Sequence, residues 1–181
     1  MIENNKKTNF YNQTWRLNHI YKILDKNKKE ITFKMNKAQQ FLRYIKRLDK
    51  KNRGCVRIIV LKARQHWITT YECLEKLDKA LFYSNRNLKL SAHNEKKAIE
   101  IFEIIKFAYN RLPWKIILKN WVEWRRPKTK YMTKSSIRFL ETNSRIDVVL
   151  DTRSGTPSDV HITELAFADN AKDMIIWTLP S

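Results

Sequence analysis

The sequence predicts an α/β fold with a mainly parallel sheet. Short apolar segments rich in β-branched residues alternate with longer segments whose apolar residues recur at helical spacing. Such alternation is typical of strand–helix–strand units with right-handed crossovers. The chain has 181 residues, of which 43% are hydrophobic and only two are glycine. This length and composition are enough for one packed domain.

The first 30 residues are predicted to form a helical segment ahead of that domain. Over residues 14–26, apolar side chains recur at helical spacing, and the polar stretch KNKKE that follows is typical of a turn. The apolar positions are Leu17, Ile20, Tyr21 and Leu24. A second helix is expected after Asn36, because asparagine is a frequent helix N-cap. Its apolar stripe consists of Phe41, Leu42, Ile45 and Leu48.

The rest of the chain predicts alternating strands and helices. Strands are expected over residues 56–61, 86–93, 137–140, 145–150 and 160–163. Helices are expected over 69–83 and 95–111, the second with Asn94 as its N-cap and Pro113 just beyond its end. Residues 114–135 show no clear pattern. Ligands of parallel sheets bind at the carboxyl ends of the strands, so the loop that starts at Lys62 and the strand end at Glu164 should share one edge.

Positive charge dominates the first three quarters of the chain, and the formal net charge is +19. Residues 1–54 contain 15 basic and 4 acidic residues, residues 55–140 contain 19 and 7, and residues 141–181 contain 3 and 7. Tryptophan and tyrosine are interleaved with lysine and arginine in WKIILKNWVEWRRPKTKY, residues 114–131. This pattern favours contact with nucleic acid. The alternative is an ordinary lysine-rich solvated surface, with the tryptophans serving as packing residues.

Neither cysteines nor histidines show the spacing of a metal site. Cys55 and Cys73 lie in apolar surroundings without CxxC spacing, which favours free thiols in a reducing compartment. His93 and His161 are interpreted as hydrogen-bonded structural residues. No apolar run reaches the length of a signal peptide core or a membrane span. We therefore expect an intracellular protein without a membrane partner.

The segment CVRIIVLKARQHWITTYECLEKL, residues 55–77, has the order strand, basic loop and hydroxyl-headed helix. At such a junction, backbone N–H groups and the positive helix end face phosphates, a cation neutralises them, and a hydroxyl reaches Mg²⁺. The segment therefore predicts a nucleoside triphosphate site. By spacing it is an altered phosphate loop, because Trp67 occupies the place of a glycine and Ile68 that of the lysine.

Four segments together resemble a known family. In chain order they are MNKAQQF (35–41), IIVLKARQHWITT (58–70), TRSGT (152–156) and HITELAF (161–167). As an ordered set they resemble the ATPase domain of phage and prophage terminase large subunits, the motors that pump DNA into capsids. The similarity runs from WRLNHIY (15–21) to the final WTLPS. It implies a P-loop NTPase-like three-layer domain over residues 31–181, incomplete at its C-terminus.

The resemblance assigns the phosphate-binding roles to the loop and helix after the first strand. Lys62, Arg64 and Gln65 match the phosphate loop of the family, in which Lys62 or Arg64 would neutralise the β- and γ-phosphate oxygens. Thr69 and Thr70 match a Ser-Thr pair, and one of them would hold Mg²⁺ through its hydroxyl. Without the resemblance, Arg64 could be an ordinary surface arginine.

The remaining assignments concern catalysis and the base. Glu164 matches the catalytic glutamate that orients the attacking water, with Arg64 as the second catalytic residue. Thr163 stands where relatives have Ser or Asp and would approach Mg²⁺ directly or through water. Gln39 and Gln40 match the glutamine that recognises adenine. Taken alone, Glu164 could be a solvated strand end, and the glutamines could be ordinary polar residues at a helix start. The SGT of residues 154–156 matches a loop that would contact a neighbouring subunit or phosphate.

The cofactors and partners implied by the resemblance are those of a packaging motor. They are ATP, Mg²⁺ and double-stranded DNA, together with the portal protein and the small terminase subunit. Homo-oligomers are expected only for intact relatives. The implied location is the cytoplasm of a bacterial host cell.

Two departures from the family pattern qualify this interpretation. A glycine at the position of Trp67 would permit a positive φ and close approach to phosphate, so hydrolysis is in doubt. Relatives also continue past WTLPS into a coupling motif and a nuclease domain with a carboxylate cluster. We therefore expect no nuclease activity and a truncated or degenerate copy.

Two alternatives to the ATPase interpretation remain open. The first is a basic domain of the same fold that binds nucleic acid or a packaging partner without ATPase activity. The second is a helicase-like phosphate-loop ATPase, which shares the glutamine, the loop and the acidic strand end. Thr163 before Glu164 argues against the second, since helicases of that type have an acidic pair there.

Overall fold

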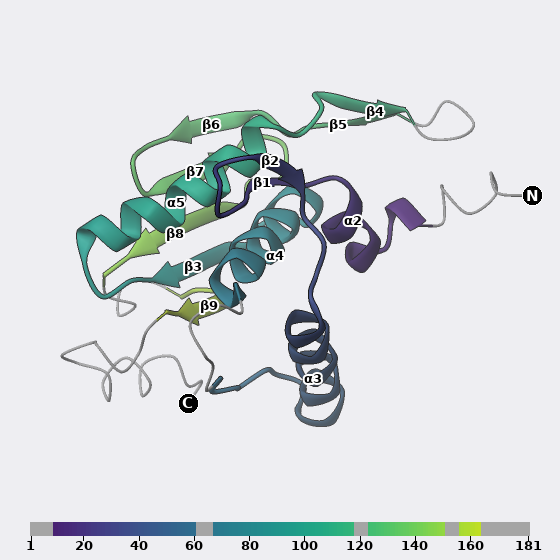
Figure 1. Cartoon of the computed structure of the whole chain (residues 1–181), viewed down its shortest axis with the longest axis vertical. Coiled ribbons are helices and arrows are strands. Elements are labelled where there is room, and N and C mark those ends of the chain that lie inside the picture. Colours follow the sequence, from purple (N-terminus) through teal and green to yellow (C-terminus); the bar gives the residue numbers. More distant parts are fainter. Residues whose placement is uncertain (1–8, 61–66, 118–122, 151–155, 164–181) are drawn as a thin grey trace, which may run out of the picture.

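The computed structural model describes residues 9–60, 67–117, 123–150 and 156–163, and its main feature is a five-stranded sheet (Figure 1). The strand order is β6-β7-β8-β3-β9. These strands span Thr129–Met132 (β6), Ser136–Phe139 (β7), Arg145–Val149 (β8), Asn87–Ser91 (β3) and Asp159–Ile162 (β9). β3 pairs in parallel with β8 and β9, whereas β7 pairs antiparallel with β6 and β8. The protein is an α/β protein, as predicted, but its sheet is mixed rather than mainly parallel.

Helices α4 (Ile68–Phe82) and α5 (Glu95–Asn110) lie side by side on one face of the sheet (Figure 1). Both occur where helical spacing predicted them, and the Asn94 side chain caps α5 by accepting a hydrogen bond from Lys97 N. The predicted apolar stripe of α5 is buried in the core, where it packs with Leu88, Leu90, Ile146 and Val148 of the sheet. Within the described part of the chain, we see no helix over the opposite face, so the predicted three-layer arrangement is not shown.

The N-terminal segment contains a short helix and a β-hairpin instead of the long helix predicted over 14–26. Helix α2 (Gln13–His19) begins after Asn12, whose side chain accepts hydrogen bonds from two backbone N–H groups of its first turn. Strands β1 (Lys22–Leu24) and β2 (Glu30–Thr32) then pair antiparallel around the predicted KNKKE turn. A short run of apolar residues fits helix and strand alike, and here the turn chemistry favours the hairpin.

Helix α3 (Lys37–Arg53) begins after Asn36, as predicted, and ends at Gly54. Asn36 and Gln39 form a reciprocal capping box, and Gly54 has a φ of 73°, a left-handed conformation that suits glycine at a helix C-terminus. The predicted apolar stripe is wrong here, because Phe41 is 65% exposed and Leu48 is also exposed. The buried residues of α3 are Gln39, Leu42, Arg43 and Asp49. This helix is therefore held largely through polar and charged contacts.

The strand predicted over residues 56–61 does not form within its described part, residues 56–60. These residues are neither helix nor strand, and the Ile59 side chain is 75% exposed. Arg57 N donates a hydrogen bond to the Asp49 carboxylate (2.8 Å), which ties the segment to α3 instead of to the sheet. The P-loop fold requires a buried strand directly before the phosphate loop, so this fold is not shown.

A second hairpin, β4 (Lys115–Ile117) with β5 (Glu123–Arg125), projects from the sheet beside β6 (Figure 1). The Trp124 ring stacks on Phe82 at a centroid distance of 5.1 Å and an interplanar angle of 9°. This contact is the packing role that we expected for the tryptophans. Trp114, by contrast, is 62% exposed, and Lys115 Nζ lies 4.6 Å from its ring centroid.

The thiols of Cys55 and Cys73 are both free, as predicted. Cys73 is buried, and burial raises the pKa of its thiol well above the ordinary value. Among the described helices, none is both long enough and apolar enough to cross a membrane.

Candidate functional site

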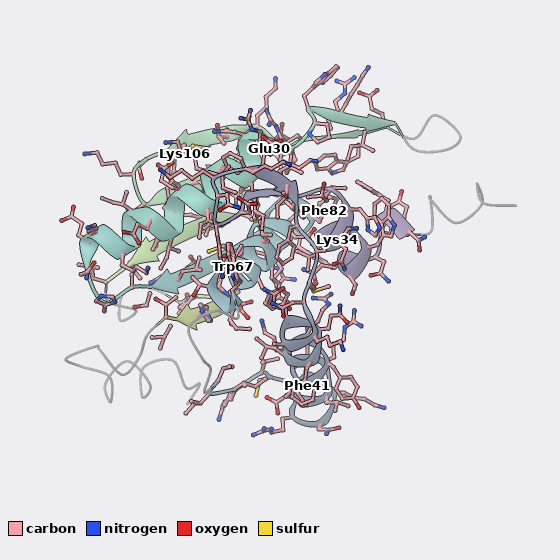
Figure 2. All side chains as sticks on the ribbon, in the orientation of Figure 1. Glu30, Lys34, Phe41, Trp67, Phe82 and Lys106 are labelled. Atoms are coloured by element: carbon pink, nitrogen blue, oxygen red, sulfur yellow. The ribbon has the colours of Figure 1, made fainter. Side chains whose placement is uncertain are left out.

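The predicted phosphate-binding helix begins at the carboxyl edge of the parallel strands. Helix α4 and the following strand β3 run in opposite directions through a short turn, so the first turn of α4 lies at the end where β3 and β9 finish. Figure 2 shows Trp67 at this end of α4 and Phe82 at the other. Thr69 and Thr70 belong to the first turn of the helix. This is the edge at which ligands bind parallel sheets.

The packing of α4 on β9 brings Thr163 to the same edge. Asp159 contacts Lys76 and Lys79. Two residues further along β9, His161 lies 4.0 Å from Glu72. A strand advances about 3.3 Å per residue and a helix about 1.5 Å, so two residues of β9 match roughly four of α4. Thr163, which follows β9, therefore lies toward the first turn of α4.

Trp67 adopts a backbone conformation that glycine accepts more readily than other residues. Its φ is 53° and its ψ 30°, in the left-handed region, and it is the N-cap residue of α4. A bulky residue in this conformation costs about 1–2 kcal/mol relative to glycine. The Trp67 side chain makes no capping hydrogen bond to the start of α4, and helix N-terminal N–H groups without such a partner can bind a ligand.

The two glutamines predicted to recognise adenine donate hydrogen bonds to backbone carbonyls of the protein. Gln39 is buried, its Oε1 accepts from Asn36 N (3.0 Å), and its Nε2 donates to the Trp67 carbonyl (2.9 Å). This amide links the start of α3 to the start of α4. Gln40 is exposed, and its Nε2 donates to the Met35 carbonyl (2.8 Å).

The threonines at the edge are buried or partly buried. Thr70 and Thr163 are buried, whereas Thr69 is partly exposed. The Thr163 hydroxyl donates to the Ser91 carbonyl (2.7 Å) and joins the ends of β9 and β3. The other predicted site residues, namely Lys62, Arg64, Gln65 and Glu164, and most of the SGT segment lie outside the described residues. Of the predicted site groups, the structure thus describes the hydroxyls of Thr69, Thr70 and Thr163 and does not describe the cation or the carboxylate.

Sequence reasoning missed a buried group of charges beneath this edge. We call it the ionic cluster, and it consists of Arg43, Lys46, Glu72, Glu75, Lys76, Lys79, Asp159 and His161. Lys76 is fully buried, and its Nζ lies 2.5 Å from Asp159 Oδ1. Lys79 Nζ lies 2.5 Å from the other carboxylate oxygen of Asp159. Lys46 bridges α3 to α4 by ion pairs with Glu72 and Glu75.

The cluster holds Glu72 and Asp159 in their ionised forms and His161 in its neutral form. Burial opposes ionisation of Asp159, but Lys76 and Lys79 outweigh burial and hold the pKa of this carboxyl well below its usual range. Burial likewise opposes ionisation of Glu72, yet Lys46, His161 and Lys76 lower its pKa to about 2. Burial lowers the pKa of His161 to about 4 despite the nearby Glu72. The charges therefore cancel largely within the protein.

The only sequence signal of this cluster is the spacing of charges along α4. Glu72 and Lys76, and likewise Glu75 and Lys79, are four residues apart, a pattern more typical of an exposed helix face. Their burial depends on α3 and β9, which pack on α4 from distant parts of the chain. Among the described residues, no group of three or more His, Cys, Asp or Glu side chains could hold a metal ion.

Comparison of the chain with protein-family models and with curated protein sequences finds no match. The interpretation of the site therefore depends on its own geometry and on the sequence motifs.

Proposed function

We propose that this chain is an ATP-binding domain of a terminase-like DNA-packaging motor, in a truncated or degenerate form. The observation that carries the proposal is the left-handed backbone of Trp67 at the start of α4. The residue that replaces the expected glycine keeps the turn that glycine would form. Two threonines follow in the first turn, and the end of β9 lies beside them.

In this proposal the chain's own groups bind and orient a nucleoside triphosphate. The N–H groups of the first turn of α4 bind phosphate oxygens, with Lys62 or Arg64 supplying positive charge and Gln65 a further polar contact. Mg²⁺ suits the hydroxyl oxygens present at this edge. Thr69 or Thr70 would hold the ion. Thr163 donates its hydrogen to Ser91, so its oxygen lone pairs stay free to accept from a metal-bound water.

Hydrolysis would use Glu164 as the residue that orients water. The water oxygen attacks the γ-phosphorus, the bond to the β-γ bridging oxygen breaks, and the products are ADP and phosphate. Arg64 would stabilise the charge on the transferred group. Because the glutamine amide of Gln39 is bound to backbone groups of Asn36 and Trp67, recognition of adenine would depend on Gln40.

A titration of the full chain with mant-ATP and Mg²⁺ tests the proposal. We expect weak binding that strengthens in Trp67→Gly, since glycine relieves about 1–2 kcal/mol of backbone strain and opens the approach to phosphate. Trp114→Gly, an exposed tryptophan on the β4–β5 hairpin, is the matched control and should leave binding unchanged. Absence of binding at millimolar nucleotide in both wild type and Trp67→Gly would overturn the proposal.

A second candidate is a basic domain that binds nucleic acid without using ATP. It is favoured by the projecting hairpin, where the exposed Trp114 lies under Lys115, and by the net charge of +19. It predicts DNA affinity that falls steeply with salt and does not respond to ATP. Fluorescence anisotropy with a labelled duplex, with and without Mg-ATP, separates the two candidates.

A further inference from the structure

A pocket lined by arginine and asparagine lies at the sheet edge opposite the predicted nucleotide site. We call it the arginine pocket; it has a volume of about 250 Å³ and is lined by Asn85, Arg86, Asn87, Arg138, Asn143 and Arg145. These residues come from the turn before β3, the starts of β3 and β8, the end of β7 and the β7–β8 turn. Helix α4 has 15 residues, so about 22 Å separates this edge from Trp67.

Two of the arginines are directly opposite each other in the sheet. Arg138 of β7 and Arg145 of β8 are register partners, and Arg145 is also the register partner of Asn87 on β3. Partners across neighbouring strands point to the same face, with Cβ atoms about 5 Å apart. Like charges at such positions repel, and an anion between them would remove the repulsion. No alternation or charge pattern in the sequence accounts for the cross-strand pair of Arg138 and Arg145.

The hydrogen bonding of the pocket leaves donors for a ligand. Arg138 Nε is buried and has no hydrogen-bond partner in the described part of the chain, although Nη2 of the same side chain donates to Asn143 Oδ1 (2.6 Å). Within the described residues, the guanidinium of Arg86 makes only a distant contact, 5.8 Å, with the Tyr83 ring. Arg145 is partly neutralised, because its Nε lies 2.6 Å from Asp147 Oδ2. Unpaired buried donors are costly and point to an unfilled acceptor.

The walls of the pocket are fixed by bonds between its two turns. Asn85 N donates to the Thr142 carbonyl (2.8 Å), and Asn143 Nδ2 donates to Asn85 Oδ1 (2.8 Å). The buried Ser144 hydroxyl donates to the Tyr83 carbonyl (2.7 Å). Asn85 and Asn143 both have positive φ values, 56° and 53°, which asparagine tolerates better than most residues. The arginines therefore lie beside turns that are held together by hydrogen bonds.

We propose that the arginine pocket binds a phosphate group, as inorganic phosphate or as a phosphodiester of a nucleic-acid backbone. Guanidinium groups match phosphate oxygens with paired hydrogen bonds. The pocket is smaller than the roughly 300–1,000 Å³ typical of sites that enclose a whole drug-sized ligand, so it fits one phosphate with its nearest atoms. Asn87 Oδ1 is buried and accepts no hydrogen bond from the described residues; a phosphate hydroxyl or a phosphate-bound water would supply a donor.

The test uses the full chain and two probes, inorganic phosphate and a short labelled DNA duplex. The pocket variant is Arg86→Gln with Arg138→Gln, and the matched control is Lys50→Gln with Lys96→Gln, two exposed lysines on α3 and α5. Isothermal titration measures phosphate at constant ionic strength, and anisotropy measures the duplex. We expect the pocket variant to weaken phosphate binding about tenfold or more, with about twofold or less in the control.

The two probes distinguish the source of the phosphate. Loss of both phosphate and duplex binding in the pocket variant identifies a backbone phosphodiester as the ligand, and loss of phosphate alone identifies a free-phosphate site. Equal effects of pocket and control variants on both probes, or no saturable phosphate binding by the wild type, would overturn the proposal. Circular dichroism checks folding, and Arg86→Gln alone replaces the double variant if that variant unfolds. Mant-ATP binding at the opposite edge is measured separately, so failure of either proposal leaves the other testable.

Discussion

The ionic cluster and the arginine pocket differ in how the protein neutralises positive charge. In the cluster, Arg43 and Lys76 are buried and Lys46 and Lys79 are partly buried, and all four form ion pairs with the carboxylates of Glu72, Glu75 and Asp159. In the arginine pocket, Arg145 pairs with Asp147, whereas Arg86 and Arg138 form no ion pair with any described residue. The difference indicates that the cluster stabilises the fold, whereas the pocket keeps an excess of positive charge at the surface.

The physical reason is the cost of removing a charge from water. That cost is several kcal/mol for each ion in a protein interior, and only close opposite charges offset it. Lys76 can be fully buried because Asp159 lies 2.5 Å from its Nζ. Arg86 needs no such partner, since it remains exposed to solvent. Changes in the two regions should therefore have very different effects on stability.

The largest effect is expected for Asp159→Asn. This change leaves Lys76 buried with only the more distant Glu72 (3.9 Å), and breaking one side of a buried ion pair costs about 3–5 kcal/mol. Chemical denaturation should show this loss as a lower midpoint. Glu100→Gln, which removes an exposed ion pair with Lys97, is the control and should cost less than about 0.5 kcal/mol. Equal effects of the two variants would show that the cluster is not buried.

The second prediction concerns the dependence of stability on pH. The pKa of His161 is about 4 in the folded protein, against 6.5 ordinarily, so between these values the unfolded chain binds a proton that the folded chain does not. The free energy of unfolding should therefore fall as the pH drops from 6.5 to about 4, by about 1–3 kcal/mol. The charged groups around His161 are Glu72, Asp159, Lys46 and Lys76.

Substitution of His161 measures how much this residue contributes to the fall in the free energy of unfolding. His161→Gln should flatten the stability curve between pH 6.5 and 4, whereas His19→Gln, an exposed histidine of α2, should leave its slope unchanged. Further acidification protonates Glu72 and then Asp159, whose folded pKa values are lowered, so both variants should lose stability there. An unchanged slope in His161→Gln would contradict a buried neutral histidine.

A smaller effect is expected in the arginine pocket. Arg86→Gln removes an exposed cation that faces two like charges, so the free energy of unfolding should change by less than about 0.5 kcal/mol. Any gain should appear at low salt and vanish at high salt, because salt screens the repulsion. Thermal unfolding at two salt concentrations measures this. A loss of more than about 2 kcal/mol would mean that the pocket is a structural element like the cluster.

The sequence predicts structural features that depend on neighbouring residues better than features that depend on contacts between distant elements. Helix α5 was predicted with its cap and its apolar stripe, because capping and helical spacing are local. Helix α3 was placed correctly, but its apolar stripe was wrong, since α4 meets α3 through Arg43 and Lys46 instead. Neither the ionic cluster nor the arginine pocket was predicted, because both combine residues from distant elements whose register the sequence does not show.

The candidate site was predicted in part for the same reason. Thr69 and Thr70 lie in the first turn of α4 and Thr163 follows β9, at the sheet edge where we expected the Lys62 loop and Glu164. We expected a positive φ at this position only for glycine, and Trp67 adopts it nonetheless. The contacts of Gln39 could not be inferred, because a capping box and a base-recognition residue look alike in sequence.

The smallest effect is expected in the segment that the sequence predicted as the first strand. Ile59 is 75% exposed, so Ile59→Ser should change the free energy of unfolding by only a few tenths of a kcal/mol. Leu90→Ala, in the buried strand β3, should cost about 2–5 kcal/mol. A strand formed by residues 56–60 along the edge of β9 would cover Asp159 and His161 more deeply. A loss of more than about 2 kcal/mol in Ile59→Ser, together with a changed loss of stability between pH 6.5 and 4, would contradict this description. It would mean that residues 56–60 pack on the sheet and cover the ionic cluster.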